Sequence, residues 1–309
     1  MLPPTNLLPI FGELLMRVFV TGATGFVGSA VVADLIAAGH SVTGLSRSDA
    51  GAAALTAMGA AVHQGSLEDH ACLRSGAAAS DGVLHLAFNH DFSKFADNCA
   101  LDRRAIMALG EELKGSERPL IVTSGVALLA PGRLATEDDA AARHFPRVSE
   151  AAAEDLAEQG VRAGIVRLPP TTHGEGDHGF VPRLIAIARE KGAAAYIGDG
   201  SNRWPAAHRV DAARVYRLAL EQGASARRYH AIAEEGVPFK VIAEVIGKRL
   251  GLPVVSKSPD EAEAHFGWFA RFAAVDVPTS SAKTRATLRW APKEKGLIED
   301  LDQPYYFKV

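Results

Sequence analysis

Short apolar runs alternate with longer Ala-rich stretches over residues 17–168. Apolar runs of about four to eight residues indicate buried strands, and longer stretches with helical periodicity indicate helices. Regular alternation of the two is typical of βα units, which build a parallel sheet. Strands are expected at 17–21, 41–46, 61–64, 82–87, 120–123 and 162–167. Helices are expected between them at 25–38, 50–58, 68–75, 92–114 and 149–159.

The pattern changes after Leu168, where Gly and Pro interrupt the chain more often. Helices are expected at 181–191 and 211–221, a strand at 194–198, a loop at 198–209, and small mixed α/β elements at 229–233, 238–250, 254–256 and 260–265. We therefore expect residues 16–170 to form a Rossmann domain with a doubly wound parallel sheet. Residues 205–235 are expected to return to this domain. Segments 171–204 and 236–309 are expected to form a smaller, mixed α/β substrate-binding lobe, with the ligand at the edge where the strands end.

The composition is that of an ordinary globular protein and excludes a disordered or fibrous chain. Of 309 residues, 48% are hydrophobic and 22% are charged. The net charge is -3 and Lys and Arg form no dense block, so neither nucleic acid nor an anionic membrane is expected as a partner. No apolar run approaches the roughly 20 residues of a membrane-spanning helix. A small molecule is the expected partner.

The cysteines and the N-terminus indicate a cytoplasmic protein. Cys72 and Cys99 lie 27 residues apart without metal-ligand spacing, which is typical of two reduced thiols. Residues 1–15 lack the charged start and the cleavage site of a secretion signal. Because Met16 directly precedes the first expected strand, we interpret 1–15 as an N-terminal extension and Met16 as the natural start.

The strongest motif is TGATGFVG, at residues 21–28, between the first strand and the first helix. Gly22 permits a tight turn, Gly25 permits close approach of a pyrophosphate, and Gly28 permits close packing of helix on strand. These are the roles that the three glycines have in a Rossmann dinucleotide-binding site. A glycine-rich turn with a purely structural role is the alternative. The remaining cofactor contacts expected in this segment are Thr21, Thr24, Phe26 and Val27.

With this motif, the chain from Met16 onward resembles the extended and atypical short-chain dehydrogenase/reductases, the NAD-dependent epimerase/dehydratase-like group. Further matches are the segments 65–69, 85–87, 122–124, 167–170 and 210–211. The resemblance implies an active-site serine at Ser124 and, through the helices 92–114 and 149–159, a homodimer. It also implies cofactor contacts from Ser66, Leu67, Leu86, Ala87, Phe88, Thr123, Leu168, Pro169 and Pro170.

The end of the second expected strand bears on the choice of nicotinamide cofactor. NAD-binding members usually carry an acid there, which binds the ribose 2′-hydroxyl. This chain has Ser46, Arg47 and Ser48 instead. A guanidinium can bind phosphate oxygens through two parallel N–H bonds, so NADP(H) is favoured. Arg47 stacked on the adenine is the alternative and would also permit NAD.

The catalytic motif of the family is absent. Typical members carry Tyr and Lys in a YxxxK motif, and the matching positions here are Pro146 and Glu150. Ser124 remains available to bind a substrate oxygen, and Arg147 could replace the Lys beside the nicotinamide ribose. His144 and His173 are the candidates for proton transfer. The alternative for these His and Arg side chains is that they are solvated or cap a helix.

Two later loops carry candidate substrate residues. His173 and His178 share a six-residue segment with two carboxylates, but no further ligand pair recurs at a suitable spacing, so no metal is expected. The resemblance places this segment beside the nicotinamide and substrate. It likewise implies substrate contacts from Arg203, Trp204 and His208. A core aromatic at Trp204 and a solvated charge at Arg203 are the alternatives.

These observations favour an NADP(H)-dependent oxidoreductase that acts on a carbonyl or alcohol carbon of a small molecule. A cofactor-binding sensor without turnover is an alternative, because the Tyr and Lys are missing. A sugar-nucleotide epimerase or dehydratase that uses other acid/base groups is the third hypothesis.

Overall fold

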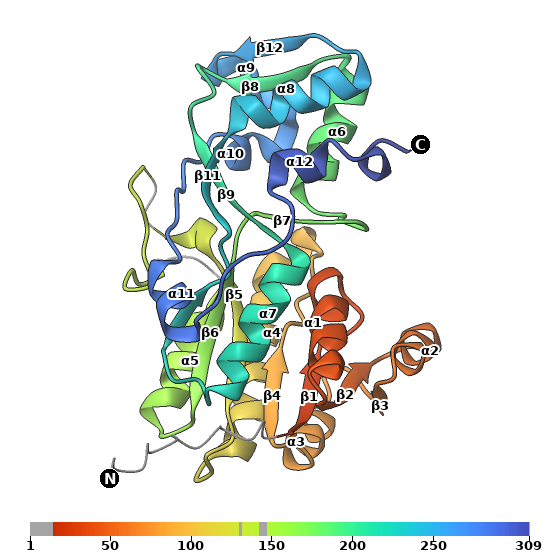
Figure 1. The fold of residues 1–309 in the computed structure, drawn as a ribbon, viewed down its shortest axis with the longest axis vertical. Coiled ribbons are helices and arrows are strands. Elements are labelled where there is room, and N and C mark those ends of the chain that lie inside the picture. The colour runs from red at the N-terminus through yellow and green to blue at the C-terminus, as the bar shows by residue number, and fades with distance from the viewer. Residues whose placement is uncertain (1–14, 130–131, 142–146, 309) are drawn as a thin grey trace, which may run out of the picture.

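A seven-stranded parallel sheet forms the centre of the larger domain (Figure 1). The computed structural model describes residues 15–129, 132–141 and 147–308. The sheet order is β3-β2-β1-β4-β5-β6-β10, so the order reverses between β1 and β4, where a doubly wound fold binds its ligand. The strands are β1 Arg17–Thr21, β2 Ser41–Ser46, β3 Ala61–Gln64, β4 Gly82–His85, β5 Leu120–Gly125, β6 Ala163–Leu168 and β10 Arg228–His230.

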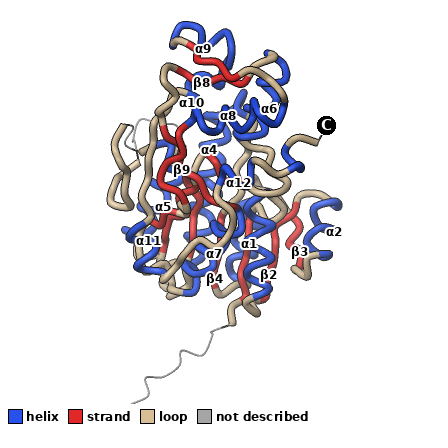
Figure 2. The backbone as a smooth tube through the Cα atoms, turned by 45° about the horizontal axis from the view of Figure 1, so that its top comes forward, coloured by secondary structure: helices blue, strands red, loops and turns tan. Residues whose placement is uncertain are grey.

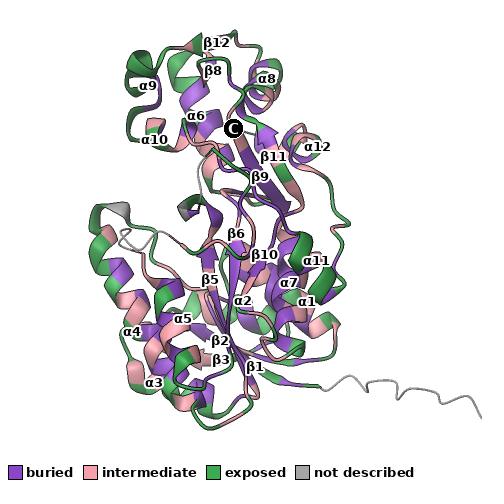
Figure 3. Ribbon diagram, turned by 90° about the vertical axis from the view of Figure 1, so that its left-hand side faces the viewer, coloured by how far each residue is buried: buried purple, intermediate pink, exposed green. Residues whose placement is uncertain are grey.

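Helices cover both faces of this sheet. One face carries α1 (Phe26–Ala37) and α7 (Arg209–Glu221), and the other carries α3 (His70–Ala78), α4 (Phe95–Leu113) and α5 (Ser149–Glu158). The short helix α2 (Asp49–Ala57) contacts β2 and the edge strand β3. The central strands β1, β4, β5 and β6 are largely buried, so they consist mainly of apolar residues and appear as buried arrows between half-exposed helices (Figure 3), whereas the edge strand β3 is mostly exposed.

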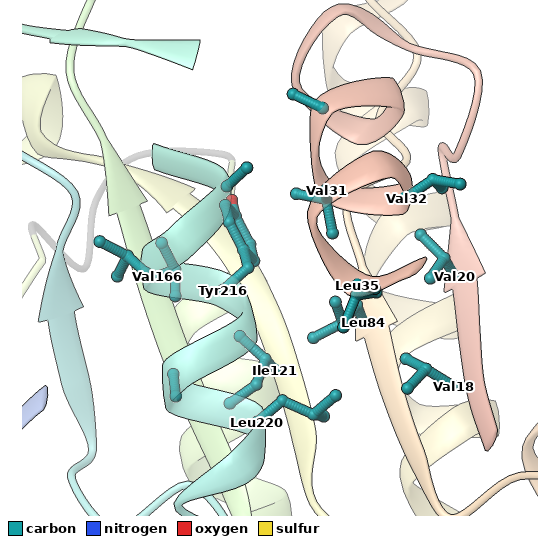
Figure 4. Close-up of a cluster of buried hydrophobic side chains, with 14 of the residues drawn as sticks. Val18, Val20, Val31, Val32, Leu35, Leu84, Ile121, Val166, Tyr216 and Leu220 are labelled. Atoms are coloured by element: carbon teal, nitrogen blue, oxygen red, sulfur yellow. The ribbon is translucent and has the colours of Figure 1, made fainter. Parts of the chain in front are cut away.

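The core on the α1 and α7 face explains why these two helices, far apart in sequence, lie together. Val31 and Leu35 of α1 and Tyr216 and Leu220 of α7 are each 0% exposed (Figure 4). They pack over Val18, Val20, Leu84, Ile121 and Val166 of the strands. Each such buried side chain contributes about 1.5 to 3 kcal/mol of transfer free energy, so α7 is an integral part of the domain.

The second lobe contains two small sheets and several short helices (Figures 1 and 2). A three-stranded sheet has the order β11-β9-β7, and a two-stranded sheet pairs β12 with β8. The strands are β7 Thr171–His173, β8 Ala194–Ile197, β9 Arg203–His208, β11 Glu234–Pro238 and β12 Val254–Lys257. The helices are α6 Phe180–Lys191, α8 Phe239–Leu250, α9 Pro259–Phe266, α10 Ala270–Ala273 and α12 Leu297–Leu301, with 3-10 turns at Gly267–Phe269 and Pro304–Tyr306.

The chain crosses between the two lobes several times. As expected from the sequence, α7 and β10 return to the large sheet. Helix α11 (Ala282–Leu288) also returns and contacts α7 and β10. Leu288 and Trp290 are 2% and 4% exposed in the core below α1 and α7. The expected assignment of all of 236–309 to the second lobe therefore does not hold around α11.

The main departure from the expected elements is β9, which replaces the expected loop at 198–209. Pro205 lies in the middle of this central strand, where its missing N–H argues against a strand. The structure accommodates it because the pairing of β11 shifts register opposite Pro205, between Glu234 and Val237. The carbonyl of Pro205 in turn accepts a hydrogen bond from Thr171 Oγ1 at 2.5 Å.

The helix expected at 92–114 is also divided. A 3-10 turn at Phe92–Lys94 precedes α4, which begins at Phe95. Asp91 accepts a hydrogen bond from the backbone N–H of Ser93 at 3.0 Å and so caps the 3-10 turn. In the part of the chain that the structure describes, no helix is long and apolar enough to cross a membrane.

Candidate functional site

The turn between β1 and α1 has a backbone that only glycine permits. Gly22 has a φ of +71°, and a Cβ there would lie 2.6 Å from the backbone nitrogen of Ala87. A Cβ on Gly28 would lie 1.9 Å from the carbonyl oxygen of Gly22. Gly25 donates its N–H to that same carbonyl at 3.0 Å and precedes the first residue of α1. The predicted roles of Gly22 and Gly28 in a tight turn and close packing agree with this geometry.

The start of α1 fits the pyrophosphate of a dinucleotide. The first backbone N–H groups of a helix have no partner within the helix. In α1 no side chain of the described residues caps them either. Thr24 and Gly25 are exposed, and Phe26 and Val27 are partly exposed. These donors and the positive end of the helix dipole suit an anion that approaches a backbone without side chains.

The ends of neighbouring strands place the other expected cofactor residues at the same edge of the sheet. Leu86, Ala87 and Phe88 follow β4, and the N–H of Ala87 donates to Thr21 Oγ1 at 3.4 Å. Ser66 and Leu67 follow β3. Leu168 ends β6, and Pro169 and Pro170 follow it.

At the end of β2, the two serines and Arg47 differ in role. Ser46 donates to the carbonyl of Ser48 at 2.9 Å, and Ser48 Oγ accepts the N–H of Gly51 at 3.2 Å and caps α2. These hydroxyl groups therefore hold the turn. Arg47 is exposed. The pKa of Glu68, which follows β3, is lowered by a hydrogen bond from Ser66 and, to a smaller degree, by the positive charge of Arg47.

Ser124, the expected active-site serine, is buried near the end of β5. Its side chain is 3% exposed, and within the described residues its Oγ has no hydrogen-bond partner. The preceding Thr123 is fully engaged: its Oγ1 donates to the carbonyl of His85 at 2.8 Å and lies 2.9 Å from the hydroxyl of Tyr216. A buried hydroxyl group without a partner is costly, so Ser124 is the group that a ligand oxygen would satisfy.

Arg147 binds the backbone of the residue before this serine. Its Nη2 donates to the carbonyl of Thr123 at 3.3 Å, and its guanidinium carbon lies 4.3 Å from the centroid of the Phe88 ring. Among the described residues, no carboxylate forms an ion pair with Arg147. The cation is therefore held by a carbonyl, the hydroxyl of Ser149 and an aromatic face, and within the described residues no carboxylate pairs with it.

Glu150, which occupies the position of the missing Lys, does not replace it. Its carboxylate accepts two hydrogen bonds from Arg167, at 2.9 and 2.6 Å. The side chains of Arg167 and Glu150 are 0% and 6% exposed, and Arg167 Nη1 also contacts His230 Nε2 at 3.1 Å. This ion pair belongs to the interior between α5 and β6.

A buried chain of hydrogen bonds connects the glycine-rich turn with Arg147. Thr21 Oγ1 lies 2.8 Å from Nδ1 of His85, and His85 Nε2 lies 3.0 Å from Asp102. The other oxygen of Asp102 accepts from Ser149 at 2.6 Å, and Ser149 accepts from Arg147 Nε at 3.2 Å. Thr21, His85, Asp102 and Ser149 are at most 3% exposed. The sequence predicted the position of His85 at the strand end, but not that of Asp102, whose only signal is a carboxylate on an otherwise apolar helix face.

His173 is fully buried, which argues against the expected direct role in proton transfer. It is 0% exposed, its Nδ1 lies 2.9 Å from Asp300, and its ring contacts His208 at a centroid distance of 5.5 Å. His178 lies elsewhere, exposed and 5.8 Å from the Phe26 ring. The six-residue segment thus does not converge on one point, and no group of three metal-ligating side chains occurs within 15–129, 132–141 and 147–308.

The segment after β7 is tied to the C-terminal part of the chain. The hydroxyl of Tyr306 accepts the N–H of Gly174 at 3.0 Å and lies 3.3 Å from carboxylate oxygens of both Asp177 and Asp300. Burial raises the pKa of Asp177 to about 6. Burial and the nearby His173 lower the pKa of His208, which caps α7 by accepting the N–H of Val210 at 3.3 Å.

The structure does not bring Arg203 and Trp204 to this edge of the sheet. Trp204 is 1% exposed and packs on Phe239 at a ring distance of 4.9 Å, so it is a core residue and not a substrate contact. Arg203, at the start of β9, binds both oxygens of Asp276, at 3.0 and 2.9 Å. His208, the third residue of the expected substrate segment, lies at the other end of β9. Its neighbour Arg209 contacts Ser29 in the first turn of α1, so this end of β9 is close to the β1–α1 turn.

His144 and Pro146 lie outside the described residues, so proton transfer by His144 stays a prediction. The homodimer through α4 and α5 also stays a prediction.

Comparison with known proteins places these features in context. The model of the NAD dependent epimerase/dehydratase family matches residues 18–232. An uncharacterized protein of Schizosaccharomyces pombe is 52% identical over 295 residues, which cover 94% of this chain and 100% of that protein. A 4-hydroxy-2-methyl-3-oxo-4-farnesyl-3,4-dihydroquinoline-1-oxide ketoreductase of Stigmatella aurantiaca is 27% identical over 82% of this chain and 80% of its own. The structure of the dTDP-glucose 4,6-dehydratase DesIV from Streptomyces venezuelae, with NAD and TYD bound, superposes with a TM-score of 0.74 at 19% identity, covering 94% of this chain and 97% of that one.

Proposed function

The chain belongs to the NAD dependent epimerase/dehydratase family, and from this premise we propose that it is an NADP(H)-dependent oxidoreductase acting on a carbonyl or alcohol of a small molecule. A bound nicotinamide would supply or accept the hydride. The residues present suit such a cofactor, because Gly22 and Gly25, which lack side chains, leave room for its pyrophosphate at the start of α1.

One observation carries the proposal: the end of β5 holds a buried hydroxyl group without a partner, and a cation that forms no ion pair with the described residues binds the adjacent backbone. Ser124 Oγ lacks a partner, and Arg147 binds the carbonyl of the adjacent Thr123. When a hydride reaches a carbonyl carbon, negative charge develops on the oxygen. Ser124 can donate a hydrogen bond to that oxygen, and Arg147 can stabilise its charge.

Arg147 does not supply the proton that completes the reduction. A guanidinium stays protonated under all ordinary conditions, so its role is electrostatic. The proton comes from another donor, for which His144 remains the predicted residue and water is the alternative. In the same position, Arg147 can also bind the nicotinamide ribose in place of the missing Lys.

The preference for NADP(H) rests on the end of β2. In this fold the adenosine ribose lies beside that strand end, where NAD-specific sites provide a carboxylate. Here Arg47 is exposed, and Ser46 and Ser48 use their hydroxyl groups to hold the turn on which it stands. A 2′-phosphate would gain a charge-assisted pair with Arg47.

The names of two bacterial relatives support carbonyl reduction as the direction of the reaction. One is the ketoreductase of Stigmatella aurantiaca, and the other is a 2-alkyl-3-oxoalkanoate reductase of Stenotrophomonas maltophilia, 27% identical over 79% of this chain. Both names describe reduction of a ketone, so small ketones and oxo acids are the first substrates to test.

The test is a screen of small ketones, oxo acids and aldehydes in which NADPH consumption is followed by absorbance, with NADH in parallel. We expect turnover with NADPH, and we expect Ser124→Ala and Arg147→Ala to reduce turnover on the same substrate. Tight NADPH binding with no turnover on any carbonyl would instead identify a sensor and contradict the proposal.

A further inference from the structure

Arg209, the first residue of α7, reaches across to the first turn of α1. Its Nη2 donates to Ser29 Oγ at 3.2 Å, and its guanidinium carbon lies 4.9 Å from the centroid of the Phe26 ring. Its Nη1 donates to the carbonyl of Glu175, in the segment after β7, at 3.1 Å. The guanidinium is therefore placed beside the same helix start that suits a pyrophosphate.

Arg209 forms no ion pair with the described residues, unlike its neighbours on the same helix. Arg214 forms ion pairs with Asp211 at 2.7 Å and Glu294 at 2.9 Å, and Arg217 forms one with Asp34 at 2.7 Å. Partial burial lowers the pKa of Arg209, and the more distant charge of Glu175 offsets this effect to a smaller degree. Placing a cation in partly dry surroundings without a paired carboxylate is costly.

The two helix dipoles increase this cost. Arg209 is at the N-terminus of α7 and also beside the N-terminus of α1. Both ends carry partial positive charge, which favours anions and disfavours cations. A bound anion between the guanidinium and the first N–H groups of α1 would relieve the repulsion from both helices at once.

We propose that Arg209 binds the pyrophosphate of the dinucleotide, opposite the backbone donors of the β1–α1 turn. The inference rests on the proposed cofactor site and adds the side chain that neutralises the pyrophosphate. The ring of Phe26 packs on the face of the flat guanidinium, and the carbonyl of Glu175 accepts a hydrogen bond from its Nη1. These two contacts fix the direction in which the N–H donors of Arg209 point. The role differs from that of Arg47, because both NAD and NADP carry a pyrophosphate.

The experiment measures dissociation constants of the full chain for ADP-ribose, NADPH, NADH and adenosine 2′-monophosphate by calorimetry. We expect Arg209→Gln to weaken ADP-ribose, NADPH and NADH by the same factor, about 10- to 100-fold, the range for loss of a charge-assisted hydrogen bond. Adenosine 2′-monophosphate has no pyrophosphate, so its affinity should change less than about twofold. Arg209→Lys should restore part of the loss. Arg214→Gln, on the same helix, is the matched control and should leave every dissociation constant unchanged.

Two results would overturn the inference. The first is unchanged ADP-ribose affinity in Arg209→Gln. The second is an equal loss for adenosine 2′-monophosphate together with a lowered unfolding temperature of the unliganded variant, which would show that Arg209 only ties Glu175 to α1. The proposed function fails separately: a wild-type chain that reduces no carbonyl but loses ADP-ribose affinity in Arg209→Gln would support this inference and contradict the reductase.

Discussion

The two ends of the proposed cofactor site are built from different groups. The phosphate end consists mainly of backbone, held by Gly22, Gly25 and Gly28 in one continuous segment of eight residues. The nicotinamide end consists of side chains, chiefly Ser124 and Arg147, from elements far apart in the chain. A backbone site needs only that side chains be absent, whereas a side-chain site needs each group to be positioned by its neighbours. The two ends should therefore respond differently to substitution.

The largest effect is expected at the phosphate end, from Gly25→Val. The φ of Gly25 is -71°, and a Cβ there meets only the carbonyl of Gly22 at 3.1 Å, so the fold tolerates a side chain better than the ligand does. We expect dinucleotide affinity to fall by about 1000-fold, because the branched side chain occupies the pyrophosphate position. Calorimetry measures the loss of dinucleotide affinity, and circular dichroism tests whether the fold is kept. Gly28→Ala is the contrasting control: its Cβ overlaps the carbonyl of Gly22, so it should lower the free energy of unfolding by about 1 to 3 kcal/mol.

The next effect is expected at the nicotinamide end, from Arg147→Ala. Electrostatic stabilisation of a developing oxyanion is worth about 100- to 1000-fold in turnover, while NADPH affinity should change only a few-fold. Ser124→Ala should show the same division between turnover and binding. Steady-state kinetics and an independent NADPH titration separate the two quantities. If both variants kept wild-type turnover on a true substrate, the side-chain half of the site would be misassigned.

Arg47→Asp should change the choice between cofactors and leave the chemistry intact. The variant loses the partner of the 2′-phosphate and places a like charge beside it. We expect the preference for NADPH over NADH to fall by about 10- to 100-fold. Competitive titration of both nucleotides gives the ratio directly, with Arg74→Asp on the exposed surface of α3 as the control. An unchanged ratio would remove Arg47 from the site.

Asp102→Asn tests the buried chain behind Arg147. The carboxylate accepts from both Ser149 and His85, but an amide accepts at one oxygen only, so one of these donors loses its partner. We expect turnover to fall by about tenfold and the unfolding free energy by about 1 to 3 kcal/mol. In an Arg147→Ala background the same change should have no further effect on turnover. Additive effects on turnover would show that Asp102 does not act through Arg147.

The smallest effect concerns pH. Backbone N–H groups do not titrate, so ADP-ribose affinity should be nearly constant between about pH 5 and 8. Asp177 does titrate: its pKa is about 6 in the folded chain and lower when unfolded, so between about pH 4 and 6 the folded chain binds the proton more tightly. Its contribution to the unfolding free energy therefore falls as pH rises through that window.

Denaturant unfolding at two pH values tests this sign. Asp177→Asn cannot ionise, so it should be about 1 to 2 kcal/mol more stable than the wild type at pH 7.5 and nearly equal to it at pH 4. A stability difference of the same size at both pH values would mean that hydrogen bonding, and not ionisation, governs this position.

The sequence predicted the strands and the turn at the proposed phosphate end because local signals suffice there. The strands β1, β2 and β3 and the three glycines follow from apolar runs and turn chemistry within single segments. The nicotinamide end was predicted only in part. Ser124 was predicted from the resemblance to the family, but Asp102 on α4 and Arg209 on α7 acquire partners only through tertiary contacts.

The second lobe shows the same limit. Pro205 and the surrounding Gly-rich stretch indicate a loop, and the strand β9 forms because the bulge in β11 and the hydroxyl of Thr171 compensate for the proline. His173 resembled a site residue because of its neighbours in sequence. Its partner, Asp300, is 127 residues away, and no local pattern signals that contact.

The repeated crossing of the chain between its lobes constrains how the protein can be divided. A fragment that ended at residue 170 would lack Tyr216 and Leu220 of α7 as well as Leu288 and Trp290, and the sheet face beneath them would be open to water. Neither lobe is an exchangeable module that could be grafted onto a relative by a single cut. Altered substrate range in this chain should therefore arise from point changes and loop replacements within the whole, and recombination would have to transfer three separate segments together, 16–170, α7 to β10 and 282–290, to preserve one core.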